Sequence, residues 1–162
     1  MRFHYLPGSK RYPDSEAEYR LLLQRQHTVL TDLNAPAELT VITCGWNTDD
    51  QTEPVDRSPE LEAVAPGTYW RTVMEDDHLP PEFQVRTHLY AGQLANMPRT
   101  LDPLLRAIAD EVTIGVILAP PGLDWLVHPY DGGIDIITAT VAERDELKGR
   151  HPDWLSSHPQ GY

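Results

Sequence analysis

The chain has 162 residues, of which 40% are hydrophobic, so it can bury the core of one domain without metal or disulfide support. Its single cysteine, Cys44, excludes an internal disulfide, and no stretch approaches the roughly 18 consecutive apolar residues of a membrane span. With 25 acidic against 13 basic residues and a net charge of −12, the chain repels nucleic-acid phosphates and anionic membranes, so we expect a cytoplasmic protein that binds neither.

One helix and one strand are expected before the most acidic part of the chain. Residues 1–13, which include two prolines, are predicted to be an irregular arm. Ser15 and Glu18 form a capping-box pattern, and leucines and valines at helical spacing then predict an amphipathic helix over 15–33. β-branched residues in near-alternation predict a strand over 39–46.

The middle of the chain combines two expected strands with most of the negative charge. Residues 47–67 contain prolines and little apolar periodicity, which predicts a long acidic loop. Strands are expected over 68–75 and 83–90, joined by an acidic, proline-rich link. From 47 to 82 the chain has ten acidic and two basic residues, so this segment contributes −8 of the net charge.

Two interpretations of the acidic segment remain open. It can be a solvated region that keeps the protein soluble, or an acidic surface that attracts a basic partner. In the second interpretation the candidate binding residues are Asp49, Asp50, Asp76 and Asp77.

The second half of the chain is predicted to form a helix, three closely spaced strands and a short last helix. The first of these helices begins near Thr100 and carries an apolar stripe to Val112, with Pro103 tolerated in its first turn. The strands and the last helix are expected over 113–119, 123–128, 134–138 and 141–148.

This order of elements predicts an α+β fold. Strands joined by short turns pair as antiparallel neighbours, so we expect a single, largely antiparallel sheet of about five to six strands. Two main helices should cover one face of the sheet, with a short C-terminal helix in addition. No internal repeat or linker divides the chain, so residues 1–162 are expected to form one domain.

A β-hairpin is predicted at Asp131-Gly132, which lies between two short apolar strands. If these residues are the centre of a type I′ turn, His128 lies opposite Asp135. A turn centred on Gly132-Gly133 would instead place His128 opposite Ile137. We prefer the first register, because it pairs apolar residues with each other and a base with an acid.

The hairpin residues permit three interpretations. A carboxylate that orients an imidazole is half of a general acid–base pair, so His128 and Asp135 are candidate catalytic residues, and His128 with either Asp131 or Asp135 could form part of a metal site. The same residues also form a satisfied polar pair on a half-buried sheet, with Asp131 there to make the turn and the glycines to allow positive φ. Tyr130 and Asp131 could alternatively belong to a binding surface.

Several familiar motifs are missing from the sequence. It contains no glycine-rich phosphate loop, no nucleophile elbow, no cysteine pair and no His-x-x-x-His spacing, so we predict no cofactor and assign no metal. The tryptophans are expected to be core anchors, although exposure of Trp46 or Trp70 would favour a partner interface. The four are Trp46, Trp70, Trp125 and Trp154.

The C-terminal block, residues 123–162, carries a resemblance to a known family. Its residues are His128-Pro129-Tyr130-Asp131, the stretch Gly133–Ile137, and downstream Leu147 and Trp154-Leu155. This set resembles the uncharacterised, mostly bacterial domain of unknown function 3885. Members typically carry a second acid and an Arg-Gly after the Tyr-Asp pair, where this chain has two glycines. The resemblance implies a recurring domain and no particular activity.

Three functions follow from these observations. We prefer a non-catalytic protein-binding module, immunity-type or regulatory, whose acidic surface binds a basic protein partner. The alternative is a small hydrolase or lyase that uses His128 and Asp135 as an acid–base or metal site. The third is a hairpin with a purely architectural role. An enzyme requires these side chains to converge in a concave pocket, which the other two functions do not.

Overall fold

The computed structural model describes residues 1–47, 53–54, 57–75, 78, 80 and 84–155. The strands are β1 (Arg2–His4), β2 (Glu38–Asn47), β3 (Thr68–Glu75), β4 (Val85–Ala95), β5 (Ile117–Ala119), β6 (Leu126–Tyr130) and β7 (Gly133–Ile137). The helices are α1 (Glu16–Asp32), α2 (Pro59–Val64), α3 (Pro98–Ala109) and α4 (Val141–Arg150), with short 3-10 turns η1 (Pro7–Ser9) and η3 (Pro152–Trp154).

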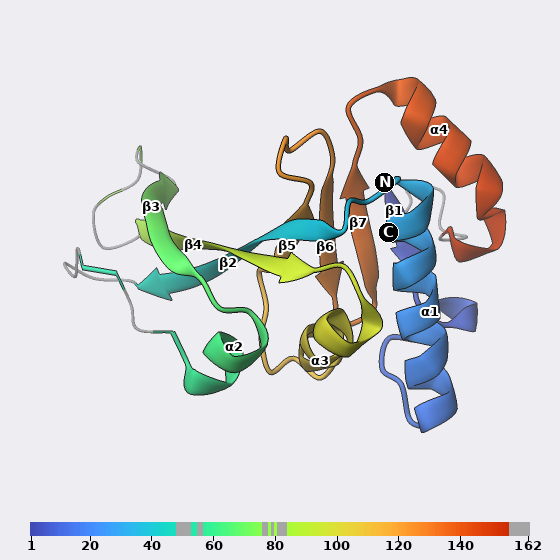
Figure 1. Cartoon of the computed structure of the whole chain (residues 1–162), viewed down its shortest axis with the longest axis horizontal. Coiled ribbons are helices and arrows are strands. Elements are labelled where there is room, and N and C mark those ends of the chain that lie inside the picture. The colour runs from blue at the N-terminus through green and yellow to red at the C-terminus, as the bar shows by residue number, and fades with distance from the viewer. Residues whose placement is uncertain (48–52, 55–56, 76–77, 79, 81–83, 156–162) are drawn as a thin grey trace.

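These strands form one antiparallel sheet in the order β1-β7-β6-β5-β2-β4-β3, which confirms the predicted α+β fold (Figure 1). The predicted helices at 15–33, 100–112 and 141–148 correspond to α1, α3 and α4. Helix α3 begins earlier than predicted because Pro98 occupies its first turn. Within the described residues, no helix is long and apolar enough to cross a membrane.

Helix α1 begins where the sequence predicts. The side chain of Ser15 accepts a hydrogen bond from the backbone N–H of Glu18 at 3.3 Å. The carboxylate of Glu18 does not complete a capping box, because it binds the Nζ of Lys10 and the N–H of Asp14 instead. Reciprocal capping occurs at α4, between Thr140 and Glu143.

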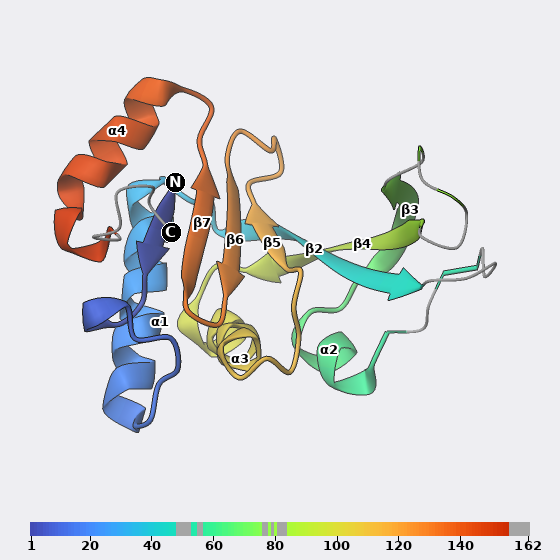
Figure 2. The ribbon, with the colours of Figure 1, turned by 180° about the vertical axis from the view of Figure 1, so that it is seen from behind.

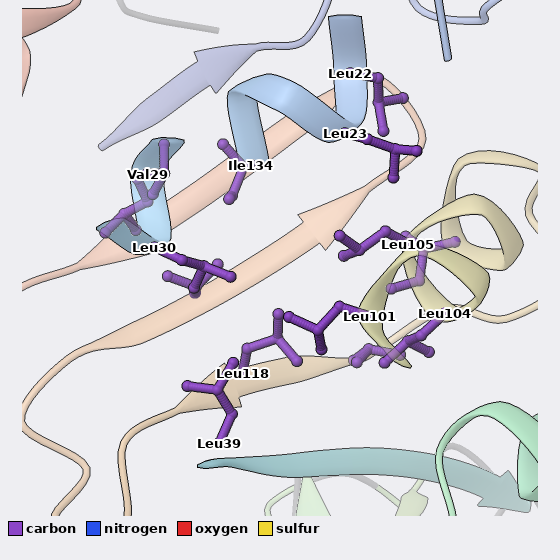
Figure 3. Packing of buried hydrophobic residues seen from close by; sticks show 14 of the residues in the cluster. Leu22, Leu23, Val29, Leu30, Leu39, Leu101, Leu104, Leu105, Leu118 and Ile134 are labelled. Carbon is purple, nitrogen blue, oxygen red and sulfur yellow. The ribbon is translucent and has the colours of Figure 1, made fainter. Parts of the chain in front are cut away.

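The buried core lies between the helices and one face of the sheet. Figures 1 and 2, which show opposite sides of the molecule, place α1 and α3 on the same side of the strands, and Figure 3 shows their leucines directed at β5 and β7. Residues that are opposite each other in the register share a face of the sheet. The buried strand residues on the helix side are Phe3, Leu39, Val41, Leu94, Leu118, Val127, Ile134 and Ile136.

We call the other side of the sheet the open face. The register places two groups of side chains on it, one at each end of the sheet. At the β1 end the group is Arg2, His4, Asp135, His128 and Tyr130. At the β3 end it includes Thr40, Ile42, Trp46, Thr87, Ala91 and Val73.

Two expectations about irregular regions were wrong in part. Residues 2–4 of the predicted irregular arm form β1, which pairs with β7 and buries Phe3. A three-residue strand is too short to show periodicity, and its partner lies more than 100 residues away, so no local pattern predicts it. Within the predicted acidic loop, α2 forms because Ser58 caps it and Pro59 occupies its first turn. With β1, the sheet has seven strands.

A close backbone approach holds the connection between α2 and β3 against β4. A Cβ atom at Gly92 would lie 1.9 Å from the carbonyl oxygen of Pro66, so only glycine fits at this point of the sheet. Gly149, near the end of α4, has no neighbour within 4 Å of a corresponding Cβ.

We predict that Gly92→Ala destabilises the protein by about 2 kcal/mol or more, since backbone has to move to relieve the overlap. The matched substitution Gly149→Ala should stabilise it by about 0.5–1 kcal/mol, because alanine is the better helix former. Urea denaturation followed by circular dichroism measures both. Equal stability of the two variants would contradict the close approach of Pro66 to β4.

Candidate functional site

The predicted hairpin register is confirmed. His128 lies opposite Asp135 and Tyr130 lies opposite Gly133, with a two-residue turn between the strands (Figure 2). The predicted type I′ turn is wrong, since it requires positive φ at both central residues and neither Asp131 nor Gly132 has one. The alternation of apolar residues therefore determined the register correctly, although the turn was assigned to the wrong class.

Gly133 is required by a close approach and not by its φ angle. A Cβ atom here would lie 2.4 Å from the carbonyl oxygen of Phe3 and 2.6 Å from the hydroxyl oxygen of Tyr130. The strand β1 therefore passes beside β7 at a distance that only glycine allows. The second glycine of the hairpin explains how the N-terminal segment packs, a role that the sequence analysis did not consider.

Asp135 binds Arg2, a partner that no local sequence pattern predicts. Nε and Nη2 of Arg2 donate to the two carboxylate oxygens of Asp135, each at 2.8 Å. Burial alone would raise the pKa of Asp135, but the hydrogen bonds and the charge of Arg2 outweigh burial and hold that pKa below its usual value. Both oxygens that could have oriented an imidazole are thus engaged by a guanidinium group.

His128 shares the open face with Asp135 and lies beside Tyr130. The ring centroids of His128 and Tyr130 are 6.1 Å apart, with the ring planes tilted by 41°. The register therefore brings the predicted base and acid to opposite positions on neighbouring strands. The contacts of the acid are with Arg2, so the geometry supports an ion pair that fastens β1 to β7 more directly than an acid–base pair.

Asp131 and Tyr130 anchor the segment that follows β1. Asp131 is almost fully buried and accepts a hydrogen bond from Nε of Arg11. The guanidinium carbon of Arg2 lies 5.2 Å from the centroid of the Tyr130 ring, a cation–π arrangement. Burial, the largest cause, raises the pKa of Tyr130 to about 12. The Tyr-Asp pair thus holds two arginines of the N-terminal segment.

A shallow cleft of about 300 Å³ lies at this junction. Arg2, His4, Arg11, Tyr130 and Asp131 line it, together with Ser9 and Gly132, whereas the candidate catalytic residues on β6 and β7 do not. Burial, followed by the positive charge of Arg2, lowers the pKa of His4, so this imidazole is neutral at pH 7. Within the described residues, no group of three or more His, Cys, Asp or Glu side chains could hold a metal ion.

Two of the four tryptophans are exposed, contrary to the prediction that all are core anchors. Trp125 is buried and Trp154 packs against the core, but Trp46 is 42% exposed and Trp70 is 50% exposed. Trp46 points to the open face, which none of the described helices covers. The sequence of the strand could not reveal this exposure. An alternating pattern shows which residues share a face, but it does not show which face the helices cover.

The exposed tryptophans belong to an apolar area at the β3 end of the open face. Trp46 and Val73 lie on either side of Thr87 of β4, since both are register partners of that residue. Trp70 and Leu123 line a hollow of about 250 Å³ together with Ile42, Thr40 and Ala91. We call Trp46, Trp70, Val73 and Leu123 the tryptophan patch; each is at least 37% exposed.

The acidic candidates Asp49, Asp50, Asp76 and Asp77 lie outside the described residues. Their place in the chain can still be related to the sheet. Strand β2 ends at Asn47, opposite Arg86, and β3 ends at Glu75, opposite Val85. Strands β2 and β3 therefore end beside neighbouring residues of β4, close to Trp46 and Val73. The two acid-rich segments follow these strand ends in the sequence.

A comparison with protein families accounts for almost the whole chain. The family model described as domain of unknown function DUF3885 matches residues 1–159. The chain belongs to the DUF3885 family. The match extends beyond the C-terminal block, so the DUF3885 domain includes β1 with Arg2 as well as the hairpin that β1 joins. Neither a curated protein nor a solved structure matches the chain.

The ion pair of Arg2 with Asp135 leads to a prediction about pH. At neutral pH, Arg2→Ala should lower the free energy of unfolding by about 1 kcal/mol, because the pair is bidentate but partly exposed to solvent. The folded-state pKa of Asp135 lies below the usual 3.8, so the contribution is complete well above pH 4 and disappears as the pH falls through the lowered pKa. Thermal unfolding of both proteins between pH 7 and pH 2.5 measures the difference.

Arg144→Ala is the control for this prediction. Arg144 pairs with its exposed neighbour Asp145, so its loss should change stability by less than about 0.5 kcal/mol at any pH. A destabilisation by Arg2→Ala that stays constant down to pH 2.5 would mean that Arg2 acts by packing on Tyr130, not by its charge.

Proposed function

We propose that this DUF3885 protein is a cytoplasmic, non-catalytic protein-binding module, of the immunity or regulatory type, that binds a basic protein partner. The observation that carries the proposal is the exposure of Trp46 and Trp70 on the open face of the sheet. Tryptophan is the residue type most enriched among side chains that dominate protein–protein binding energy. Exposed apolar area of this kind is typical of surfaces that bind another protein.

The charge of the surrounding chain selects the class of partner. The segment from 47 to 82, which contains Trp70 and follows Trp46 directly, has ten acidic and two basic residues. A basic partner would be attracted to it over about 10 Å at moderate ionic strength, which speeds association. An acidic partner would be repelled.

The alternative, a hydrolase or lyase centred on His128 and Asp135, has less support. Arg2 occupies both carboxylate oxygens of Asp135, and neither candidate catalytic residue lines the cleft at the β1 end of the sheet. An acid–base pair needs a concave site in which a substrate contacts the base. The arrangement of these residues is better explained by the attachment of β1.

The proposal is tested by capture and reconstitution. Immobilised protein is incubated with lysate of its own organism, and the captured protein is identified, purified and titrated calorimetrically. We predict a partner of basic isoelectric point, with a dissociation constant that Trp46→Ser and Trp70→Ser each weaken by about tenfold or more. The matched control is Ile137→Ser on β7, which removes an apolar side chain that is 65% exposed on the same face.

The outcomes separate clearly. A partner whose affinity drops with the tryptophan variants and is unchanged by Ile137→Ser supports the proposal. Absence of a reproducible partner, or equal losses with all three variants, rejects it. Circular dichroism of each variant checks that the fold is retained.

Salt dependence provides an independent prediction. The association rate with the partner should fall about tenfold between 50 and 500 mM salt, because screening removes the long-range attraction. The double substitution Asp76→Asn with Asp77→Asn should slow association at low salt. The control pair Asp145→Asn with Asp153→Asn removes the same charge on and after α4 and should have a smaller effect. An association rate that changes neither with the salt concentration nor with these substitutions would contradict electrostatic attraction by this segment.

A further inference from the structure

The two edges of the sheet differ in a way that concerns binding. Strand β1 forms one edge and has three residues, whereas β3 forms the other and has eight. An edge strand presents unpaired backbone N–H and C=O groups, and proteins usually limit this hazard with short strands, prolines or lysines. Strand β1 is short, whereas β3 is longer and contains neither proline nor lysine, although it has one β-bulge and the charged residues Arg71 and Glu75. Within the described residues, β3 pairs with β4 alone.

Apolar side chains are exposed on both faces of β3. The register places Val73 on the open face, and Trp70, at the β-bulge, lines the hollow together with Ile42 of that face. Tyr69 and Met74 lie on the other face and are 48% and 43% exposed. The side chains of a strand added beside β3 would therefore contact apolar side chains of β3 on both faces of the sheet.

We propose that β3 is a docking edge, to which an extended, basic segment of a partner protein adds as a further strand. This inference rests on the proposed function, and it specifies how the basic partner binds. In strand addition, main-chain hydrogen bonds supply affinity while alternate side chains supply specificity. On β3, one set of partner side chains packs on Val73 and the alternate set packs on Met74, with Trp70 and Tyr69 beside the end of the added strand.

The register limits where the added strand pairs. A β-bulge interrupts the β3–β4 ladder between Tyr69 and Arg71, and bulges increase local twist. Beyond the bulge, residues 71–75 continue in regular register with β4. We place the added strand along 71–75, immediately before the acidic pair Asp76-Asp77 of the sequence.

Charge selects a basic segment over a second copy of this chain. Two copies joined at β3 would bring together two segments that each carry −8, within molecules of net charge −12. Like charges of this size oppose association. A lysine- or arginine-rich strand is attracted to the same edge.

The test uses a synthetic peptide, so it does not depend on a captured partner. The peptide has seven residues of alternating lysine and valine, acetylated and amidated. Two controls match it: one with N-methyl groups on the three central residues, which removes backbone donors and keeps the side chains, and one with glutamate in place of lysine. Binding is measured by NMR titration, and amide hydrogen exchange is measured at saturating peptide.

We expect the lysine–valine peptide to bind at least tenfold more tightly than either control and to slow exchange at least tenfold at alternate amides within 71–75. Equal affinity of the N-methylated peptide, or protection located outside β3, overturns the inference. A concentration-dependent dimer of the peptide-free chain, with the same amides protected, overturns it too, since the edge then belongs to a second copy.

The failure of this inference is distinguishable from failure of the proposed function. A captured partner that is sensitive to Trp46→Ser but leaves exchange within 71–75 unchanged rejects strand addition alone. Binding of the lysine–valine peptide to β3, without any basic protein captured from lysate, supports the docking edge and rejects the cellular role assigned to it.

Discussion

One-sided burial is the constraint on which the rest of this structure depends. The core leucines of α1 and α3 pack against the same face of the sheet, and most of the buried apolar strand residues lie on that face. Burial of these side chains supplies the main driving force for folding. None of the described helices covers the open face, so the large apolar side chains of Trp46, Val73 and Ile137 meet solvent there. Trp46 is exposed for this reason, although β2 is as regular around Trp46 as it is around its buried residues.

The hairpin shows how far sequence reasoning can reach and where it stops. The position of His128 opposite Asp135 was predictable because side chains alternate between the two faces along a strand. A shift of the register by one residue would have placed the polar residues on the buried face. The contact of Asp135 with Arg2 spans 133 residues, and nothing local to either residue encodes it. The same holds for β1, whose three residues gain their strand conformation from the pairing with β7.

The Tyr-Asp-Gly-Gly turn is a related case, in which the contacts of the residues differ from those expected. Asp131 was expected to make the turn and the glycines to permit positive φ. In the structure Asp131 binds Arg11, and Gly133 makes room for the backbone at Phe3. Each is therefore explained by the N-terminal segment that crosses the hairpin. A motif that organises tertiary packing resembles a catalytic cluster in sequence, since both gather polar residues and glycines at a turn.

The two ends of the sheet consequently differ in the chemistry of their exposed side chains. At the β1 end, charged side chains are paired within the molecule: Arg2 with Asp135 and Arg11 with Asp131. Pairing of this kind leaves little free charge for a ligand, so the family motif and the proposed binding surface need not coincide. At the β3 end the apolar patch has no helix over it, and the chain's excess of acidic residues lies next to it in sequence. In the proposed function, apolar area would provide affinity and the net negative charge of the 47–82 segment would provide attraction at a distance.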